Sequence, residues 1–165
     1  MFCDAVVVSF LWLFDFDFDL FILGVIWVIG LAMVCSAFVF SLSTRTLLGL
    51  ALAIALGHHA LDHLNHDNPT LIHAVLHQRW KFEFGFGASA VAYPLLPWLA
   101  VMWGGIVLGR ACLTMPEEER LSWLKRWGLA LTVGFVVVRF WNGYGNSNLW
   151  EIQPTHSGTL IDFFN

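Results

Sequence analysis

The feature that most constrains this chain is a long stretch without charged residues, which lies between Glu83 and Arg110. Its second half begins at Tyr93 with Tyr-Pro-Leu-Leu-Pro-Trp and continues almost entirely apolar. A helix rises about 1.5 Å per residue, so this run can cross the hydrocarbon core of a bilayer, which is about 30 Å thick. Proline costs little in the first turn, because the N–H groups there have no intrahelical partner. We therefore expect a membrane-spanning helix over residues 92–110.

The composition of the whole chain agrees with a membrane protein, since 58% of its residues are hydrophobic and only 12% are charged. A soluble domain has about a quarter of its residues charged. Further uncharged runs predict spanning helices over 20–42, 46–64 and 124–141, after a truncated N-terminal helix. The expected fold is all-α, a polytopic membrane helix bundle in which residues 1–165 form a single partial domain, truncated at both ends. No cluster of basic residues indicates binding of nucleic acid.

The basic residues predict how these helices are oriented, because cytoplasmic loops carry an excess of Lys and Arg. Two predicted helices separate Arg45 from the charged loop at 110–124, so both lie on the same side of the membrane. That side carries five of the eight Lys and Arg residues. We therefore expect loop 110–124 to be cytoplasmic. The polar loop 65–91, with a short helix over 71–77, and the tail 141–165 are then outside.

Histidine is concentrated in one part of the chain, where six of the seven histidines lie between His58 and His77. Residues four apart share a face of a helix, so His59 pairs with His63 and His73 pairs with His77. Two such pairs could bind zinc, or iron as in membrane oxidoreductases. Most histidines bind no metal, and the His-x-x-His-His boxes of desaturases are absent. We therefore expect no metal, and a loop whose histidines hydrogen-bond water and lipid headgroups.

A second polar group surrounds Asp62 and Arg139, which lie near the outer ends of two predicted helices. An ion pair between them would lower the cost of each charge in the membrane. It could form the floor of an outward-facing pocket, with His58 as acid or base, or simply tie two helices together. After Arg139, Asn142 and Tyr144 lie in a Gly-rich turn, and amides and aromatic rings are also what a sugar site uses.

Two aromatic residues complete the set of pocket candidates. Tyr93 begins the helix over 92–110 on the outer side, and Trp98 lies one turn further in. We expect one outward-facing hollow to be formed by His58, Asp62, Tyr93, Trp98, Arg139, Asn142 and Tyr144. The sequence assigns a catalytic role to none of them.

Three motifs then point to a family. Gly-His-His-Ala-Leu-Asp at 57–62, Tyr-Pro-Leu-Leu-Pro-Trp at 93–98 and Arg-Phe-Trp-Asn-Gly-Tyr-Gly at 139–145 occur in this order. In order and spacing they resemble the heparan-alpha-glucosaminide N-acetyltransferase-like membrane proteins, which include many bacterial members of a domain of unknown function. Val-Ile-Trp-Val-Ile-Gly at 25–30 is similar to another family helix. The chain departs from the family at His59, where Asn is more frequent.

The resemblance implies an integral membrane acyltransferase of the bacterial inner membrane, with the lipid bilayer and a sugar acceptor as partners. It would transfer acetyl from acetyl-CoA to an amino sugar or envelope glycan. The family's catalytic histidine lies in a loop upstream of the part found here, so we expect a middle fragment that is inactive in isolation. A histidine-metal membrane oxidoreductase and a non-catalytic membrane scaffold or transporter piece are the alternatives.

Overall fold

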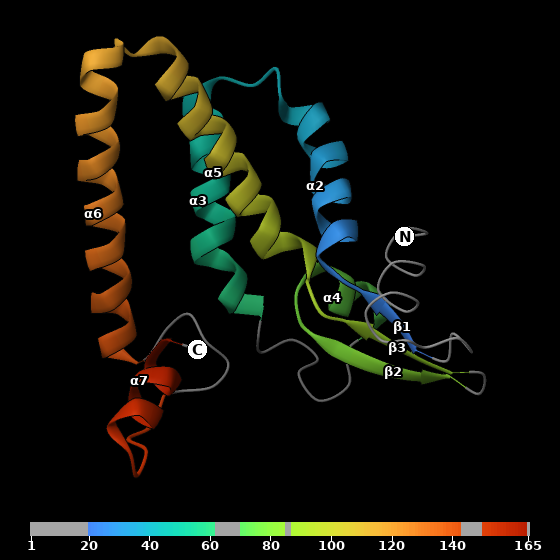
Figure 1. The fold of residues 1–165 in the computed structure, drawn as a ribbon. Coiled ribbons are helices and arrows are strands. Elements are labelled where there is room, and N and C mark those ends of the chain that lie inside the picture. The colour runs from blue at the N-terminus through green and yellow to red at the C-terminus, as the bar shows by residue number, and fades with distance from the viewer. Residues whose placement is uncertain (1–19, 62–69, 85–86, 143–149, 165) are drawn as a thin grey trace. The chain divides into compact units, whose positions relative to one another are not determined.

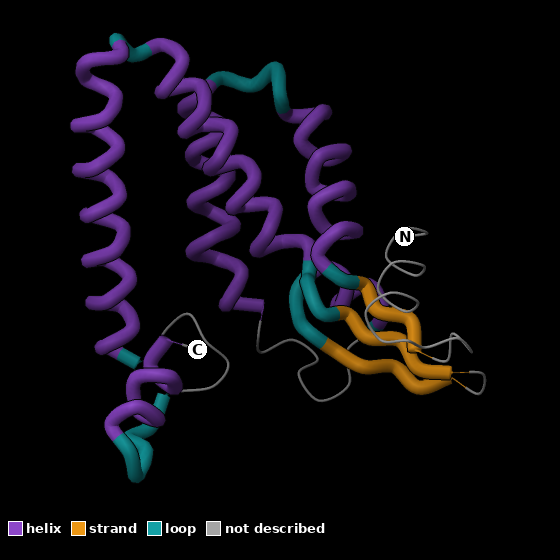
Figure 2. Tube along the Cα trace, viewed as in Figure 1, coloured by secondary structure: helices purple, strands orange, loops and turns teal. Residues whose placement is uncertain are grey.

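The computed structural model describes residues 20–61, 70–84, 87–142 and 150–164. It contains two compact units, residues Met1–Leu113 and Thr114–Asn165, which are considered one at a time. Helices dominate the described part, and the strands form only one small sheet, as Figure 2 shows. The prediction of a mainly helical fold is therefore confirmed.

The longer helices of the first unit are α2 (Val25–Val39), α3 (Thr44–Gly57) and α5 (Leu95–Thr114), shown in Figure 1. Ser43 precedes α3, and its hydroxyl oxygen accepts a hydrogen bond of 3.2 Å from the backbone N–H of Thr46. This is the usual way in which a serine satisfies one of the donors at a helix start. A short turn thus separates α2 from α3 at the place where the sequence also predicts a break.

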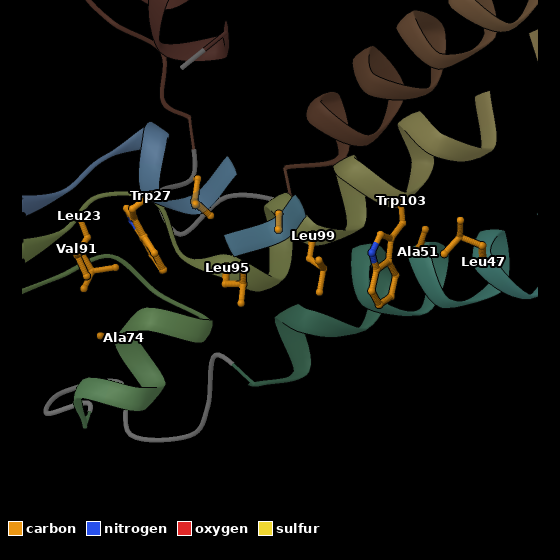
Figure 3. Close-up of a cluster of buried hydrophobic side chains, with 11 residues drawn as sticks. Leu23, Trp27, Leu47, Ala51, Ala74, Val91, Leu95, Leu99 and Trp103 are labelled. Carbon is orange, nitrogen blue, oxygen red and sulfur yellow. The ribbon is translucent and has the colours of Figure 1, made fainter. Parts of the chain in front are cut away.

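One face of α5 organises the core of this unit. Leu95, Leu99 and Trp103 are four residues apart, so they share a face of the helix, and all three are buried. In Figure 3 this face looks towards α3, where the small Ala51 lies beside the indole of Trp103. The same cluster includes buried residues from the other elements: Leu23, Trp27, Val28, Ala32, Leu47, Ala51, Ala74 and Val91.

The small sheet was not predicted. It has the order β1-β3-β2, with β1 (Leu20–Leu23) parallel to β3 (Gly87–Val91) and β2 (Trp80–Phe84) antiparallel to β3. The helix predicted over 20–42 therefore begins only at Val25. A short apolar run can form a strand or a buried helix, and hydropathy does not separate the two. Pairing of Leu23 with Val91 decides for the strand, because it buries both side chains.

The helix predicted over 46–64 is also shorter than expected, because α3 ends at Gly57 and a 3-10 turn, η2 (His58–Leu61), follows. At 15 and 14 residues, α2 and α3 are below the length of about 20 that spans a bilayer. Within the predicted loop 65–91, the structure contains α4 (Leu71–Leu76), which confirms the short helix, and the strands β2 and β3.

The second unit contains α6 (Glu117–Trp141) and α7 (His156–Phe164). The charged loop predicted at 110–124 is reduced to a turn, since α5 continues to Thr114 and α6 begins at Glu117. Pro116 precedes α6, and three glutamates occupy its first turn, where the helix dipole favours negative charge. Part of the tail predicted at 141–165 folds into α7. In its first turn the backbone N–H of Gly158 donates a hydrogen bond of 3.1 Å to the hydroxyl oxygen of Thr155, which precedes the helix.

By length and composition, α5 and α6 are the described helices that could cross a membrane. The apolar window of α5 is 22% buried, and none of the corresponding window of α6 is buried. Gly105 and Gly109 on α5, a spacing that favours close helix packing, have no atom within 4 Å of a side-chain position built on them. The described residues thus leave much of the apolar surface of both helices exposed.

Candidate functional site

The first candidate site is a group of three histidines in the first unit. His58 begins η2 directly after α3, and α4 carries His73, with His77 as its C-cap. The ring centroids of His73 and His77 are 5.3 Å apart, which confirms the predicted pair. The ring of His58 lies 6.0 Å from that of His77, a contact that the sequence did not predict. The pair of His59 and His63 stays a prediction, because His63 lies outside the described residues.

The tautomer of the neutral His58 ring follows from its surroundings. Its ring Nδ1 lies 3.0 Å from the carbonyl oxygen of Ile54 and 3.1 Å from that of Ala55. A carbonyl oxygen only accepts hydrogen bonds, so Nδ1 carries the hydrogen and donates it. In the neutral ring, Nε2 is therefore the nitrogen that can take up a proton. His58 is also the C-cap of α3, and its backbone N–H donates to the carbonyl oxygen of Ile54.

The other two histidines are more enclosed. His77 is 5% exposed, and both ring nitrogens of His73 are buried without a hydrogen-bond partner in the described parts of the chain. Burial of an unpaired polar atom is costly, so such a position suits a polar ligand or an ordered water molecule. Across the described ranges, no group of three or more His, Cys, Asp or Glu is arranged to hold a metal ion. Among the described residues, no set of metal ligands therefore supports the alternative of a histidine-metal oxidoreductase.

Tyr93 and Trp98 form an aromatic pair at the start of α5. Their ring centroids are 5.4 Å apart with an interplanar angle of 62°, an edge-to-face arrangement. Tyr93 packs against the core, whereas Trp98 is 37% exposed. Ala74 of α4 belongs to the same buried cluster as Leu95 of α5 (Figure 3). The helix that carries two of the histidines is thus packed at the end of the unit where this aromatic pair lies.

In the second unit, Arg139 contacts α7. It is 8% exposed, and its guanidinium donates from Nε to the carbonyl oxygen of Phe163 at 2.6 Å and from Nη2 to that of Asp162 at 2.8 Å. Carbonyl groups at the end of a helix have no intrahelical partner, so the guanidinium caps α7. No pattern in the sequence predicts this role. Asp62 lies outside the described residues, and its ion pair with Arg139 therefore stays a prediction.

Asn142 ends α6 in the left-handed conformation, with φ of 52°. Its side-chain amide donates to the carbonyl oxygen of Trp150 at 3.0 Å, and its side-chain oxygen accepts from the backbone N–H of Trp150 at 3.1 Å. The indole N–H of Trp150 donates to the carbonyl oxygen of Arg139 at 2.9 Å. Asn142 therefore holds Trp150 against the end of α6. Tyr144 lies outside the described residues.

The five pocket candidates that the structure describes thus fall into two groups. The first unit contains His58 beside His77, and the pair of Tyr93 and Trp98. The second unit contains Arg139 and Asn142, each bonded to residues of its own unit. Their convergence on a single hollow stays a prediction. His73, His77 and Trp150 are the residues of these groups that the pocket prediction did not include.

Comparison with known proteins identifies the family. The sequence model described as heparan-alpha-glucosaminide N-acetyltransferase, catalytic, matches residues 1–138 of the 165. Comparisons with curated proteins and with solved structures gave no significant match. The matched range includes the first unit, with the histidine group and the aromatic pair, and nearly all of α6. Because the match covers more than half of the sequence, the chain belongs to the heparan-alpha-glucosaminide N-acetyltransferase catalytic-domain family.

Proposed function

We propose that this chain is part of an integral membrane acyltransferase that moves acetyl from acetyl-CoA to the amine of an amino sugar or envelope glycan. The observation that carries the proposal is the family match over residues 1–138. The length and apolar surface of α5 and α6 support a place in the bilayer, since exposed apolar side chains cover α6. The orientation of residues 110–124, which include Arg110 and Arg120, towards the cytoplasm belongs to the same proposal.

The chemistry of acetyl transfer indicates which residues would act. The amine nitrogen attacks the thioester carbonyl, a C–N bond forms, the C–S bond breaks, and the proton lost by the amine passes through a base to the departing thiolate. His58 supports the role of base, because its Nδ1 donates to backbone carbonyl groups, so Nε2 is the nitrogen without a hydrogen in the neutral ring. His77, with its ring 6.0 Å away, would hold His58 in position.

The acceptor sugar would lie near the aromatic pair. Trp98 exposes part of its indole, and Tyr93 supports that ring edge-on, so the indole is fixed and offers an apolar face to a sugar ring. The buried ring nitrogens of His73, which have no hydrogen-bond partner among the described residues, could bind a sugar hydroxyl. The first unit would thus supply both a base and an acceptor surface.

The test is acetyl transfer in membrane vesicles that carry the protein with any coding sequence that flanks this chain. Radiolabelled acetyl-CoA and glucosamine are supplied, and labelled N-acetylglucosamine is measured. His58→Asn keeps a donor for the carbonyl groups of α3 but removes the base, so transfer should fall by about 10²-fold or more. His156→Gln, an exposed histidine of α7, is the matched control and should keep full transfer.

Two results would overturn the proposal. Absence of acetyl transfer in the unchanged protein, with acetyl-CoA and a panel of amino sugars, would refute the activity. Full transfer in His58→Asn would leave the activity in place and refute the role of His58.

A further inference from the structure

The starting observation is a group of exposed apolar side chains on α7. Leu160, Ile161 and Phe164 are 59%, 70% and 65% exposed, and we call these three residues the α7 patch. Leu160 and Ile161 lie four and three residues before Phe164, so both neighbour it on one face of the helix. His156 and Ser157 are exposed at the other end of α7. The helix is therefore polar where it begins and apolar where it ends.

The apolar end of α7 lies beside α6. The ring of Phe164 stacks on that of Phe135 at 6.4 Å with an interplanar angle of 20°. Phe135 precedes Arg139 by four residues, about one helical turn nearer the middle of α6. Figure 1 shows α7 turning back at the end of α6, within the second unit. The α7 patch is thus at the level of the last turns of α6.

The positive charge of Arg139, near the end of α6, is compensated by α7. Arg139 is 8% exposed and donates to the carbonyl oxygens of Asp162 and Phe163. The C-terminal end of a helix carries partial negative charge, which stabilises a nearby cation. An arginine near the end of an apolar span needs such a partner. Trp141, which is 76% exposed at the end of α6, is of the type that is enriched at membrane–water interfaces.

We infer that the α7 patch inserts into the edge of the bilayer, where its three side chains contact lipid acyl chains while His156 and Ser157 stay in water. The inference rests on the proposed membrane location of α6. The occupant is lipid because Phe164 of the patch stacks on Phe135 of α6, a helix that also exposes Val133 and Phe140, at 53% and 66% exposure. An amphipathic helix in this position lies in the interface and does not cross the membrane.

The experiment measures the depth of single probes in the full chain, reconstituted in phosphatidylcholine vesicles. In a version without its native cysteines, Ile161→Cys is labelled with an environment-sensitive fluorophore. Ser157→Cys on the same helix is the matched control, and Val133→Cys reports α6. Quenching by aqueous iodide is compared with quenching by lipids that carry a nitroxide on the acyl chain. At position 161, we expect lipid quenching severalfold stronger and iodide quenching severalfold weaker than at position 157.

The outcomes separate the inference from its premise. Equal iodide quenching at 157 and 161 overturns the inference, as does protection of 161 from both quenchers, which would mean that protein covers the patch. Lipid quenching at Val133→Cys with either of those results leaves the membrane location of α6 intact. Absence of lipid quenching at position 133 would refute the membrane location itself. Each labelled variant should show a thermal unfolding transition at about the same temperature as the unlabelled protein, which shows that the variant is folded.

Discussion

The guanidinium of Arg110, near the end of α5, donates a hydrogen bond of 2.8 Å to the carbonyl oxygen of Leu42 in the turn between α2 and α3. It also donates to the carbonyl oxygen of Phe40 and lies 5.1 Å from the centre of the Phe40 ring. Phe40 is the C-cap of α2, so Arg110 satisfies carbonyl groups at the end of that helix. One side chain therefore joins α5 to a turn that lies far from it in the sequence.

We predict that Arg110→Ala lowers the free energy of unfolding of the first unit by about 1–3 kcal/mol, the range for hydrogen bonds to a charged group. Arg110→Lys should lose less, because an ammonium can keep one of the two bonds but not both. Arg45→Ala, at an exposed arginine of α3, is the control and should change stability by less than about 0.5 kcal/mol. Thermal unfolding in detergent measures all three. Equal effects of Arg110→Ala and Arg45→Ala would contradict the role of Arg110.

The second prediction separates the two features of Asn142, its side-chain bonds and its left-handed backbone. Asn142→Gly and Asn142→Ala both lose the hydrogen bonds to Trp150, which should cost about 1–3 kcal/mol. Alanine adds strain of about 1 kcal/mol, because an L side chain disfavours φ of this sign, whereas glycine does not. Asn142→Ala should therefore unfold at a lower temperature than Asn142→Gly. The reverse order would show that the backbone conformation is unimportant.

Hydropathy predicted the four apolar helices because long uncharged runs have few other folded forms. It failed at Leu20–Leu23, where the choice between helix and strand depends on a partner, β3, that lies far along the chain. It also predicted a charged loop that is in fact the first turns of α6. Glutamate and arginine are good helix formers, so loss of hydropathy does not mean loss of helix.

In the candidate site, too, local patterns predicted some features, whereas tertiary contacts were not predicted. The pair of His73 and His77 followed from helical spacing alone. Tyr93 and Trp98 were expected at the start of the helix over 92–110, but Tyr93 precedes α5, and the contact of the two rings was not predicted. The contact of His58 with His77 depends on how the chain returns from α3 to α4, which no local pattern encodes. The contact of Arg139 with the carbonyl oxygens of α7 is likewise a tertiary contact to backbone atoms, which carry no sequence signal.

The third prediction distinguishes two roles in the proposed acetyl transfer, that of His58 as the base and that of Trp98 as part of the surface that binds the acceptor sugar. His58→Asn should lower kcat by about 10²-fold or more with little change in KM for the sugar, because a base acts in the transition state. Trp98→Ala should raise that KM by roughly 2–10-fold, the equivalent of an aromatic contact of about 0.5–1.5 kcal/mol, with kcat nearly unchanged. Trp123→Ala, at a tryptophan of α6 that packs on Trp127, is the control for loss of an indole. A purely structural role for Trp98 would lower kcat and the yield of folded protein together.

The last prediction concerns orientation. The side of the membrane that holds Arg45, Arg110 and the first half of α6 carries five of the eight Lys and Arg residues, so it should be cytoplasmic. In a version without native cysteines, Glu83→Cys reports the outer segment 65–89, since Glu83 is exposed on β2. Glu118→Cys, which is exposed in the first turn of α6, reports the segment 112–122.

A membrane-impermeant maleimide added to intact cells should label Glu83→Cys and leave Glu118→Cys unlabelled. After permeabilisation both should react, because both positions are exposed and differ only in the side from which reagent arrives. Labelling of Glu118→Cys alone in intact cells would reverse the orientation. It would then place the histidine group and the aromatic pair on the cytoplasmic side, where an envelope glycan could not be the acceptor. Labelling of both in intact cells would show that α5, the helix between them, does not separate two compartments.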